Sequence, residues 1–248
     1  MTTYQPDLFS AIKWDSIQKP AEITEYRLVS SILDGTFPVN SDLPAERELA
    51  KNLGVTRPTL REVLQRLSRD GWLEIHQGKP TRVCDFWKEG RLGVLDVLAD
   101  HLPQLPESLI INLLNVRVAI APSYTRAAVD LAHTDVLIAL ELRHQLKSMP
   151  ENYTQFDWQL QHQLAILGNN PVFVMILNSF RELFYQLAPY YFSIMEAQKH
   201  SMDYYHHLAD AAQGRDSEKA AHLTESVMQE SLIFWKKIKL MVCHRRRK

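Results

Sequence analysis

The 248-residue sequence has few glycines, few cysteines and no long apolar run. Eight glycines are too few for a loop-rich β protein, so helix is the expected structure. The two cysteines, Cys84 and Cys243, are far apart and lack metal-ligand spacing, which argues against a disulfide framework or a zinc site. No stretch of about 18 apolar residues and no secretory leader is visible, so we expect a cytoplasmic protein without a membrane partner.

A large net charge of one sign is also missing, since the formal net charge is −1. The cations are nevertheless concentrated, because residues 56–83 contain six Lys and Arg residues but only Glu62, Asp70 and Glu74 as acids. A local basic excess in one part of a nearly neutral chain is typical of a nucleic-acid contact. The length exceeds that of a common single domain, so two domains with separate cores are expected.

Two short helices joined by a tight turn are predicted within residues 43–71. Pro44 begins the first, AERELAKNL, and Gly54 ends it. Thr56 is a suitable N-cap for the second, and Pro58 lies in its first turn, where a missing N–H costs nothing. A buried stripe with helical spacing follows at Leu60, Val63, Leu64 and Leu67. This pattern predicts a helix-turn-helix.

A further helix and a hairpin flank this pair. Apolar spacing predicts a helix over residues 21–37, which stops near Asp34-Gly35. After the pair, WLEIH and TRVCDF are strand-like runs on either side of Gln77-Gly78-Lys79-Pro80. The hairpin between them is predicted to be a wing with a small basic tip. Residues 20–85 are therefore expected to form a winged helix-turn-helix domain, preceded by an N-terminal extension over residues 1–19.

Helical periodicity dominates the rest of the chain. Residues 86–92 are predicted to be a linker, and residues 93–248 an all-α bundle. Pro122 and Pro189 are expected to kink or divide the helices that contain them, and such breaks can open space for a ligand. The predicted helices cover residues 91–101, 107–129, 133–148, 153–167, 171–196, 200–213 and 216–241.

The proposed second helix of the pair is suited to a DNA major groove. Its N-terminal end carries Arg57, Thr59 and Arg61, and arginine can grip guanine O6 and N7 while the helix N-terminus favours a phosphate. A Gly78-Lys79 tip allows close approach of the backbone to a phosphate or to the minor groove. The alternative is a solvated charged face, because such helix pairs also occur outside DNA binding.

The run LPAERELAKNLGVTRPTLREVLQRLSRDGWLEIHQGKPTRV resembles the winged-helix signature of the GntR family of transcription regulators, and is most similar to its FadR subgroup. Weaker similarity continues through LLNVR, GNNP, YYHHL and ESLIFW. The resemblance implies a homodimer that binds a palindromic double-stranded DNA operator. It implies DNA contacts at Arg47, Thr56, Arg57, Thr59, Arg61, Gln77, Gly78 and Lys79.

Many GntR regulators with a helical domain hold a metal through an aspartate and three histidines. Asp157 stands at the aspartate position, but Gln161 stands one turn later, where a histidine is needed. His162 is one residue out of register and points off that face, because one helix step is about 100°. We therefore expect no metal ligands. A residual metal site formed by Asp157 and a histidine such as His206 is kept as an alternative.

The FadR subgroup instead binds long-chain acyl-coenzyme A in the bundle, without a cofactor. The resemblance implies effector contacts at Ser231 and Trp235, with Arg117 and Tyr205 as neighbours. Met228 stands where the subgroup has a glycine, and its bulk is expected to narrow the site. The alternative for each of these residues is ordinary bundle core. The C-terminal cations, from Lys236 to Lys248, are expected to form a solvated helix end.

These expectations describe a regulator of fatty-acid metabolism, acting as a repressor, an activator or both, that leaves its operator when long-chain acyl-coenzyme A binds. One alternative is a GntR regulator of another pathway that senses an organic acid. Another is an enzyme acting on an acyl thioester. No nucleophile, base and orienting acid stand at usable spacing, so we expect no enzyme.

Overall fold

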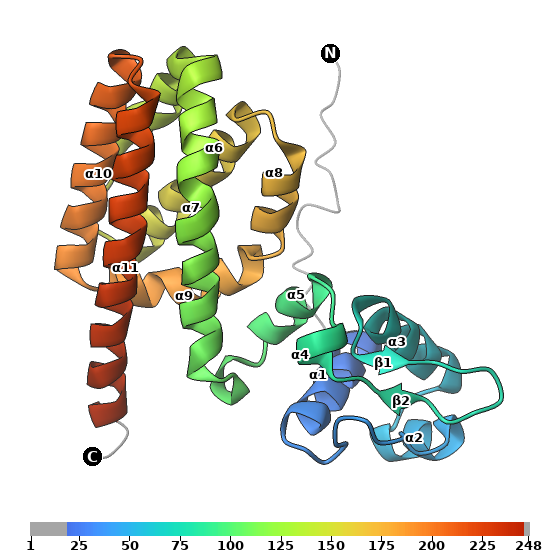
Figure 1. The fold of residues 1–248 in the computed structure, drawn as a ribbon. Helices are drawn as coiled ribbons and strands as arrows, with labels where there is room; N and C mark the ends of the chain where they lie inside the picture. Colours follow the sequence, from blue (N-terminus) through green and yellow to red (C-terminus); the bar gives the residue numbers. More distant parts are fainter. Residues whose placement is uncertain (1–18, 246–248) are drawn as a thin grey trace, which may run out of the picture. The chain divides into compact units, whose positions relative to one another are not determined.

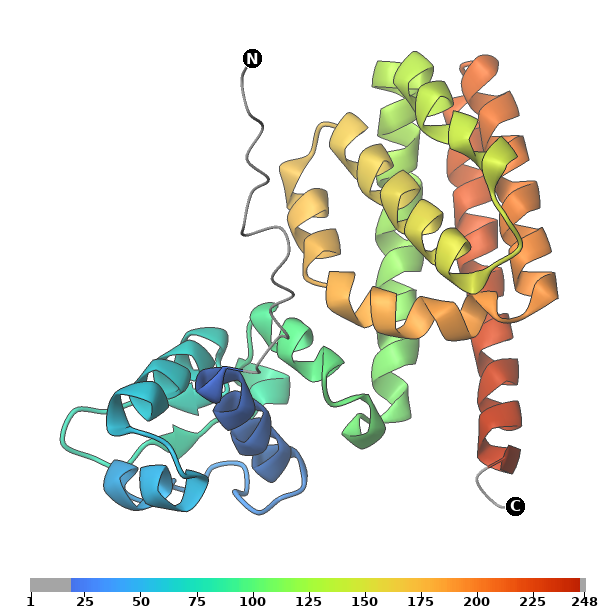
Figure 2. The same ribbon diagram turned by 180° about the vertical axis from the view of Figure 1, so that it is seen from behind.

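The computed structural model describes residues 19–245, except for the side chains of Glu107 and of residues 236–245. The predicted extension up to residue 18 and residues 246–248 therefore lie outside the described part, as do the side chains of the other C-terminal cations. The chain divides into two units, Met1–Val94 and Leu95–Lys248. Figures 1 and 2 show a small unit of helices with a hairpin and a larger unit of helices alone. The expected mainly α class is confirmed.

The smaller unit contains three main helices, α1 (Pro20–Leu33), α2 (Glu46–Leu53) and α3 (Arg57–Asp70). The predicted stop at Asp34-Gly35 is confirmed, because Gly35 adopts a φ of 80° directly after α1. Thr56 is the N-cap of α3 and Gly54 the left-handed C-cap of α2, as predicted. The predicted apolar stripe of α3 is completely buried, with Leu60, Val63, Leu64 and Leu67 at most 2% exposed.

The hairpin consists of β1 (Leu73–Glu74) and β2 (Arg82–Val83), paired antiparallel with Leu73 opposite Val83. Both strands are shorter than the apolar runs that predicted them, because residues 75–80 form an exposed loop with Gly78 at a φ of 76°. On its other edge β2 makes a bridge to Asp42, in the connection before α2. The wing is thus joined at its base to two segments of the unit.

The first part of the predicted linker is structured. Residues Phe86–Glu89 form the short helix α4, and the buried Phe86 ring stacks on Trp72 with 4.4 Å between ring centroids. The division between units falls later, after Val94, inside α5 (Gly93–Ala99). Apolar burial of Phe86 against Trp72 therefore keeps the chain attached to the winged helix beyond residue 85.

The larger unit is a helical bundle around its longest helix, α6 (Glu107–Glu141). Helix α6 packs against α7, α10 and α11, and α7 packs against α9. In Figure 2, α7 runs obliquely across the bundle. Short 3-10 helices lie before and after α6, at Leu102–Gln104 and Leu142–Gln145. The remaining helices are α7 (Pro150–Leu167), α8 (Pro171–Asn178), α9 (Arg181–Phe192), α10 (Met195–Gln213) and α11 (Ser217–Arg245).

The two prolines act differently from the prediction. Helix α6 continues through Pro122, and its kink lies at Ala132, where φ is −149° and ψ is 43°. The predicted helix 171–196 is divided, but between Asn178 and Arg181 and not at Pro189, which lies in the last turns of α9. Phe180 is buried at the division, so packing in the bundle and not a local breaker sets this boundary. None of the described helices is long and apolar enough to cross a bilayer.

Candidate functional site

The N-terminal end of α3 presents a compact set of polar side chains. The Thr56 hydroxyl lies 2.9 Å from the Thr59 hydroxyl and accepts the backbone N–H of Thr59 at 3.3 Å. This capping fixes the first turn, where backbone N–H groups and the helix dipole favour an anion. Arg57, the first residue of the helix, is exposed, and no salt bridge joins it to another described residue.

Two further arginines flank this helix end. Arg61 donates through Nε to Glu46 Oε2 at 2.7 Å, and 66% of its side chain remains exposed. The bond ties α3 to the first residue of α2 and leaves the terminal guanidinium nitrogens available. Arg47, next to Glu46, is also exposed. The Arg61–Glu46 bond thus joins α3 to the start of α2, which also carries the exposed Arg47, and the predicted DNA contacts of these arginines stay a prediction.

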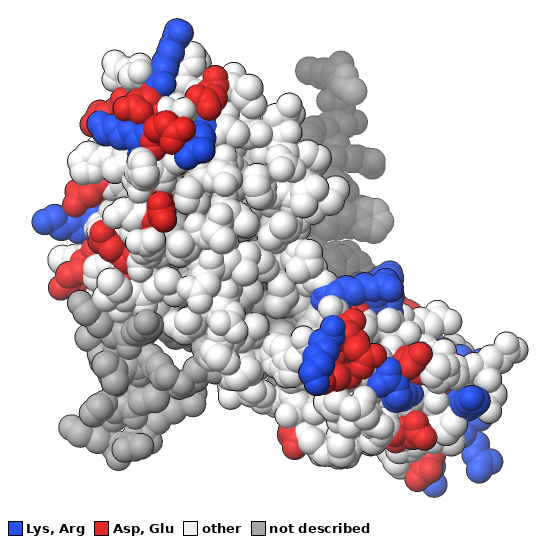
Figure 3. All heavy atoms as spheres, viewed as in Figure 1, with Lys and Arg blue, Asp and Glu red and all other residues white. Residues whose placement is uncertain are grey.

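The wing tip, which we define as residues 77–79, is exposed at every position. The positive φ of Gly78 gives the tight turn there without the strain that a side chain would cause. Figure 3 shows Lys and Arg side chains on the smaller unit with acids interspersed among them. On the face shown, the cations thus do not form one wide basic field.

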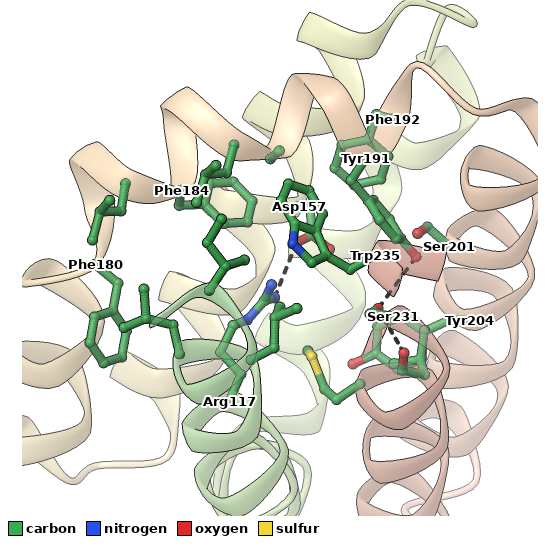
Figure 4. A pocket seen from close by; sticks show the side chains of 18 residues that line it. Arg117, Asp157, Phe180, Phe184, Tyr191, Phe192, Ser201, Tyr204, Ser231 and Trp235 are labelled. Atoms are coloured by element: carbon green, nitrogen blue, oxygen red, sulfur yellow. Dashed lines mark hydrogen bonds and ion pairs between the residues drawn. The ribbon is translucent and has the colours of Figure 1, made fainter. Parts of the chain in front are cut away.

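The larger unit contains a cavity between α6, α7, α9, α10 and α11 (Figure 4). Its water-accessible volume is about 100 Å³, and most of its wall is apolar. The predicted effector residues Arg117, Met228, Ser231 and Trp235 all line it. The other lining residues are Ile110, Leu113, Leu114, Asp157, Phe180, Leu183, Phe184, Leu187, Ala188, Tyr191, Phe192, Ser201, Tyr204 and Val227.

An ion pair lies in the wall of this apolar cavity. Arg117 Nη2 donates to Asp157 Oδ2 at 3.3 Å, and the two side chains are 16% and 11% exposed. The Arg117 guanidinium also lies over the Phe184 ring, 5.4 Å from its centroid. A guanidinium has five N–H donors, so several remain for an acceptor in the cavity. The cavity therefore offers hydrogen-bond donors whose positive charge is already balanced by a carboxylate.

Hydroxyl groups form a second polar patch in the cavity. The Tyr191 and Ser231 hydroxyls are 3.3 Å apart, and both point into the space shown in Figure 4. Tyr204 bonds the Thr224 hydroxyl at 3.0 Å, and burial raises the pKa of Tyr204 to about 12. Burial likewise raises the pKa of Tyr191. These phenols stay protonated near neutral pH. Ser231 donates to the Val227 carbonyl and Thr224 to the Ala220 carbonyl, so each phenol donates to its hydroxyl neighbour, and a ligand acceptor would have to replace that bond.

Tyr205 is not among the residues that line this cavity, and its predicted effector contact stays a prediction. Its ring is fully buried behind Asp157, and its hydroxyl donates to Asp157 Oδ1 at 3.0 Å. Burial and the negative charge of Asp157 raise the pKa of Tyr205. The cavity contains its neighbour Tyr204 instead, together with Ser201 one turn earlier on α10. The 3.6-residue period places positions 201 and 204 on one face, a signal that would have favoured Tyr204.

The surroundings of Asp157 do not fit a metal site. Both of its carboxylate oxygens accept hydrogen bonds, one from Arg117 and one from Tyr205. Gln161 Oε1 accepts the Tyr124 hydroxyl at 2.7 Å, and His162 pairs with Asn178. In the part of the chain that the structure describes, no three His, Cys, Asp or Glu side chains cluster as metal ligands would. A cationic arginine occupies the place beside Asp157 where a metal would need to be.

Comparison with protein families gives two consecutive matches. Residues 20–83 match the model of the bacterial regulatory proteins of the gntR family. Residues 84–245 match that of the FadR C-terminal domain. The boundary between the two matches falls at the base of the wing, and together they cover nearly the whole described chain.

Relatives similar along most of their length carry one common name. The fatty acid metabolism regulator protein of Shewanella halifaxensis is 40% identical over 220 residues, covering 89% of this chain and 92% of the relative. The protein of the same name from Shewanella baltica is 43% identical over 197 residues, covering 79% and 83%. Among solved structures, the Lar regulator of Listeria monocytogenes has a TM-score of 0.59 at 17% identity, covering 91% of this chain and 99% of Lar, which shows a common fold.

Proposed function

Because the chain belongs to the GntR family of bacterial regulators and contains a FadR C-terminal domain, we propose that it regulates fatty-acid metabolism and is released from DNA by long-chain acyl-coenzyme A. The family makes it a DNA-binding transcription regulator with a winged helix-turn-helix. The observation that carries the ligand proposal is the cavity of the larger unit, which combines an apolar wall with the Arg117 guanidinium and the Ser231–Tyr191 hydroxyl pair.

We assign the DNA contacts to α3 and the wing tip. Arg57 and Arg61 would read base edges in the major groove from the N-terminal end of α3, with Thr56 and Thr59 near a phosphate. Arg47 would contact the backbone beside the groove. The wing tip, with Gln77, Gly78 and Lys79, would approach the adjacent minor groove or a phosphate. All of these positions are exposed except the half-buried Thr59, which supports the assignment.

The chemistry of the cavity suits an acyl thioester. The apolar wall would surround the alkyl chain, with Trp235 covering part of it. The thioester carbonyl is neutral and accepts hydrogen bonds, which matches donors whose charge Asp157 already balances. A free carboxylate would bring a second negative charge close to Asp157 and is less suited. The bundle supplies no metal or other cofactor in this proposal.

Ligand binding can release DNA only if the ligand prefers a different arrangement of the protein. The cavity of about 100 Å³ is smaller than usual ligand pockets of about 300–1,000 Å³, so a long acyl chain must displace lining side chains of α9 or α11. We propose that this displacement changes the placement of two recognition helices in a homodimer. A palindromic operator has half-sites about one DNA turn apart. After the displacement, the two recognition helices would no longer fit both half-sites at once.

A gel-shift titration tests the proposal. The protein is bound to a duplex that it has selected from a random-sequence pool, and long-chain acyl-coenzyme A, the free fatty acid, coenzyme A and short organic acids are added separately. We expect only the acyl thioester to dissolve the complex at micromolar concentration. Dissociation by an organic acid, with no effect of the thioester, would favour a GntR regulator of another pathway.

The same incubation separates a regulator from an enzyme. We expect acyl-coenzyme A to be recovered intact after long incubation with the protein. The reason is that, among the residues that the structure describes, no nucleophile in the cavity is paired with a base and an orienting acid. Thioester hydrolysis that follows protein concentration would contradict the regulator assignment. We place such a regulator in the cytoplasm, where DNA and acyl-coenzyme A meet.

A further inference from the structure

Arg82 lies at the base of the wing, on β2, where three segments of the smaller unit meet. It stands directly opposite Glu74 of β1 in the antiparallel register. On the other side of β2, a bridge joins Arg82 to Asp42 of the connection between α1 and α2. The Arg82 side chain is only 28% exposed, so it is held against the protein and does not extend into solvent.

The Arg82 guanidinium bonds to all three neighbouring segments. Its Nε donates to Glu74 Oε2 at 2.8 Å and its Nη1 to Asn40 Oδ1 at 2.9 Å. Its Nη2 donates to Glu89 Oε2 at 2.8 Å, in the last position of α4. Glu89 in turn accepts the backbone N–H of Asp85 through Oε1 at 3.0 Å. One side chain therefore joins both wing strands, the α1–α2 connection and α4.

The end of α4 is itself fixed to the end of the recognition helix. The backbone N–H of Arg91 donates to the Asp70 carbonyl at 2.9 Å. A Cβ atom at Gly71, the C-cap of α3, would lie 2.9 Å from the Glu89 carbonyl oxygen, so the two backbones are in close contact. Through Glu89, Arg82 therefore sets the base of the wing relative to α3.

We propose that Arg82, anchored by Glu89, is a positioning residue for DNA binding that holds the wing tip in register with the recognition helix. The inference rests on the proposed contact of Lys79 with DNA. Arg82 itself touches no DNA in this proposal and acts through the orientation of residues 77–79. The wing strands contain only two residues each, so their own ladder gives little rigidity to the exposed loop beyond them.

Isolated surface ion pairs contribute little to the stability of a protein. Arg82 and its partners are not an isolated pair. A single arginine bonds the side chains of Asn40, Glu74 and Glu89 in a fork whose geometry cannot be reproduced by one flexible contact. The hydrogen bonds from Arg82 and from the Asp85 backbone lower the pKa of Glu89, so Glu89 stays ionised as their acceptor near neutral pH. The expected effect is on the direction of the wing, with a small effect on global stability.

Glu89→Gln gives a test in which simple electrostatics and positioning predict opposite results. Removing a negative charge from a DNA-binding unit should strengthen binding if only long-range charge matters. The amide of glutamine cannot accept bonds through both of its terminal atoms, so either the Arg82 or the Asp85 bond is lost. If Arg82 positions the wing through Glu89, binding should weaken despite the more favourable charge.

The experiment uses the full chain and a duplex selected by the wild-type protein from a random-sequence pool. Affinity is measured over a range of salt concentrations for wild type, Glu89→Gln, Lys79→Ala and the double variant. Glu62→Gln is the matched control, because it removes the same charge from an exposed pair with Arg66 on α3 that does not involve the wing. Thermal unfolding of every variant is recorded in parallel.

We expect Glu89→Gln to bind about three- to tenfold more weakly, with a lower salt slope close to that of Lys79→Ala, and the double variant to be no weaker than Lys79→Ala. Glu62→Gln should bind at least as well as wild type. Equal behaviour of Glu89→Gln and Glu62→Gln, or additive losses in the double variant, would overturn the positioning role. If Lys79→Ala alone has no effect, the proposed wing contact is wrong, and the positioning role falls with it.

Discussion

Arg117 and Asp157 show how single residues define the cavity of the larger unit. They lie forty positions apart in the sequence, on α6 and α7, and meet in a wall that is otherwise mainly apolar. Burying an unpaired charge costs free energy, because the charge loses its hydration. The opposite charges of Arg117 and Asp157 offset this cost for each other. Tyr205 donates to the same carboxylate and fixes its orientation. Both carboxylate oxygens of Asp157 are therefore paired within the protein, one with Arg117 and one with Tyr205.

Met228 is the cavity residue expected to limit ligand size. It is 4% exposed and lines the cavity from α11. Met228→Ala should enlarge the cavity and increase the relative affinity for longer acyl chains severalfold, at a cost in stability of about 2 kcal/mol or more. Calorimetric titration with acyl-coenzyme A of increasing chain length checks this. An unchanged order of affinities in the folded variant would show that Met228 does not limit the site.

The DNA contacts make a second prediction for single residues. Arg57→Ala should lower affinity for the selected duplex by roughly 1–3 kcal/mol and relax the preference at one base position. Lys79→Ala should mainly lower the salt slope, by about one, with little change in base preference. Binding to a library of single-base variants at two salt concentrations measures both. Equal losses of both variants on random DNA would contradict the groove assignment.

At the scale of elements, α3 is the best-defined part of the smaller unit. Its start is fixed by the Thr56 cap, its buried face by Leu60, Leu64 and Leu67, and its end by Gly71 at a φ of 90°. Gly71 ends the helix and also allows a close contact with α4. The close approach of Gly71 to the backbone of Glu89 and Gly90 joins α3 to α4.

Two glycine C-caps of the same unit give a matched prediction. Gly54 and Gly71 both have positive φ, so alanine at either position should cost about 1–2 kcal/mol. A Cβ at Gly71 would also meet the Glu89 carbonyl oxygen at 2.9 Å, whereas nothing lies within 4 Å of one at Gly54. Gly71→Ala should therefore be destabilised by about 1–3 kcal/mol more than Gly54→Ala in urea unfolding. Equal losses of unfolding free energy in the two variants would mean that the backbone at the α3–α4 contact shifts to accommodate the added Cβ.

At the scale of the whole molecule, each unit has its own core and its own task. The smaller unit carries the α3 end and the wing tip, and the larger unit carries the cavity. A substitution in the core of one unit can therefore change its stability without directly altering the site carried by the other unit. His101 of the larger unit offers such a change, because it is 1% exposed and is not among the residues that line the cavity.

His101 should make the protein less stable in mild acid. Burial lowers the pKa of His101, against a smaller opposing effect of Asp100. Below its ordinary value of about 6.5, the unfolded chain then binds a proton that the folded chain does not, so stability falls as pH decreases. His101→Gln should lose less stability than wild type between pH 7.5 and about pH 5.5. Urea unfolding at both values measures this, and parallel losses in the two proteins would exclude His101 as the cause.

The sequence predicted the elements of the smaller unit well because their signals are local. A cap such as Thr56, a left-handed glycine such as Gly54 and a helical apolar spacing each act within one or two turns. The bundle was harder to predict. Pro122 does not break α6 and Pro189 does not divide its helix, whereas the buried Phe180 lies at a division without a local breaker. Packing of neighbouring helices outweighed local preference at these positions.

The sequence by itself thus determined a helix-turn-helix with a basic wing, its candidate DNA contacts and an all-α second domain. Only the tertiary structure decided which side chains share the cavity, that Tyr204 and not Tyr205 faces it, and that Asp157 pairs with Arg117. It also decided that Arg82 joins Asn40, Glu74 and Glu89 at the base of the wing. The physical reason is the same in each case, because these contacts join residues that are close in space through packing and whose spacing along the chain carries no periodic signal.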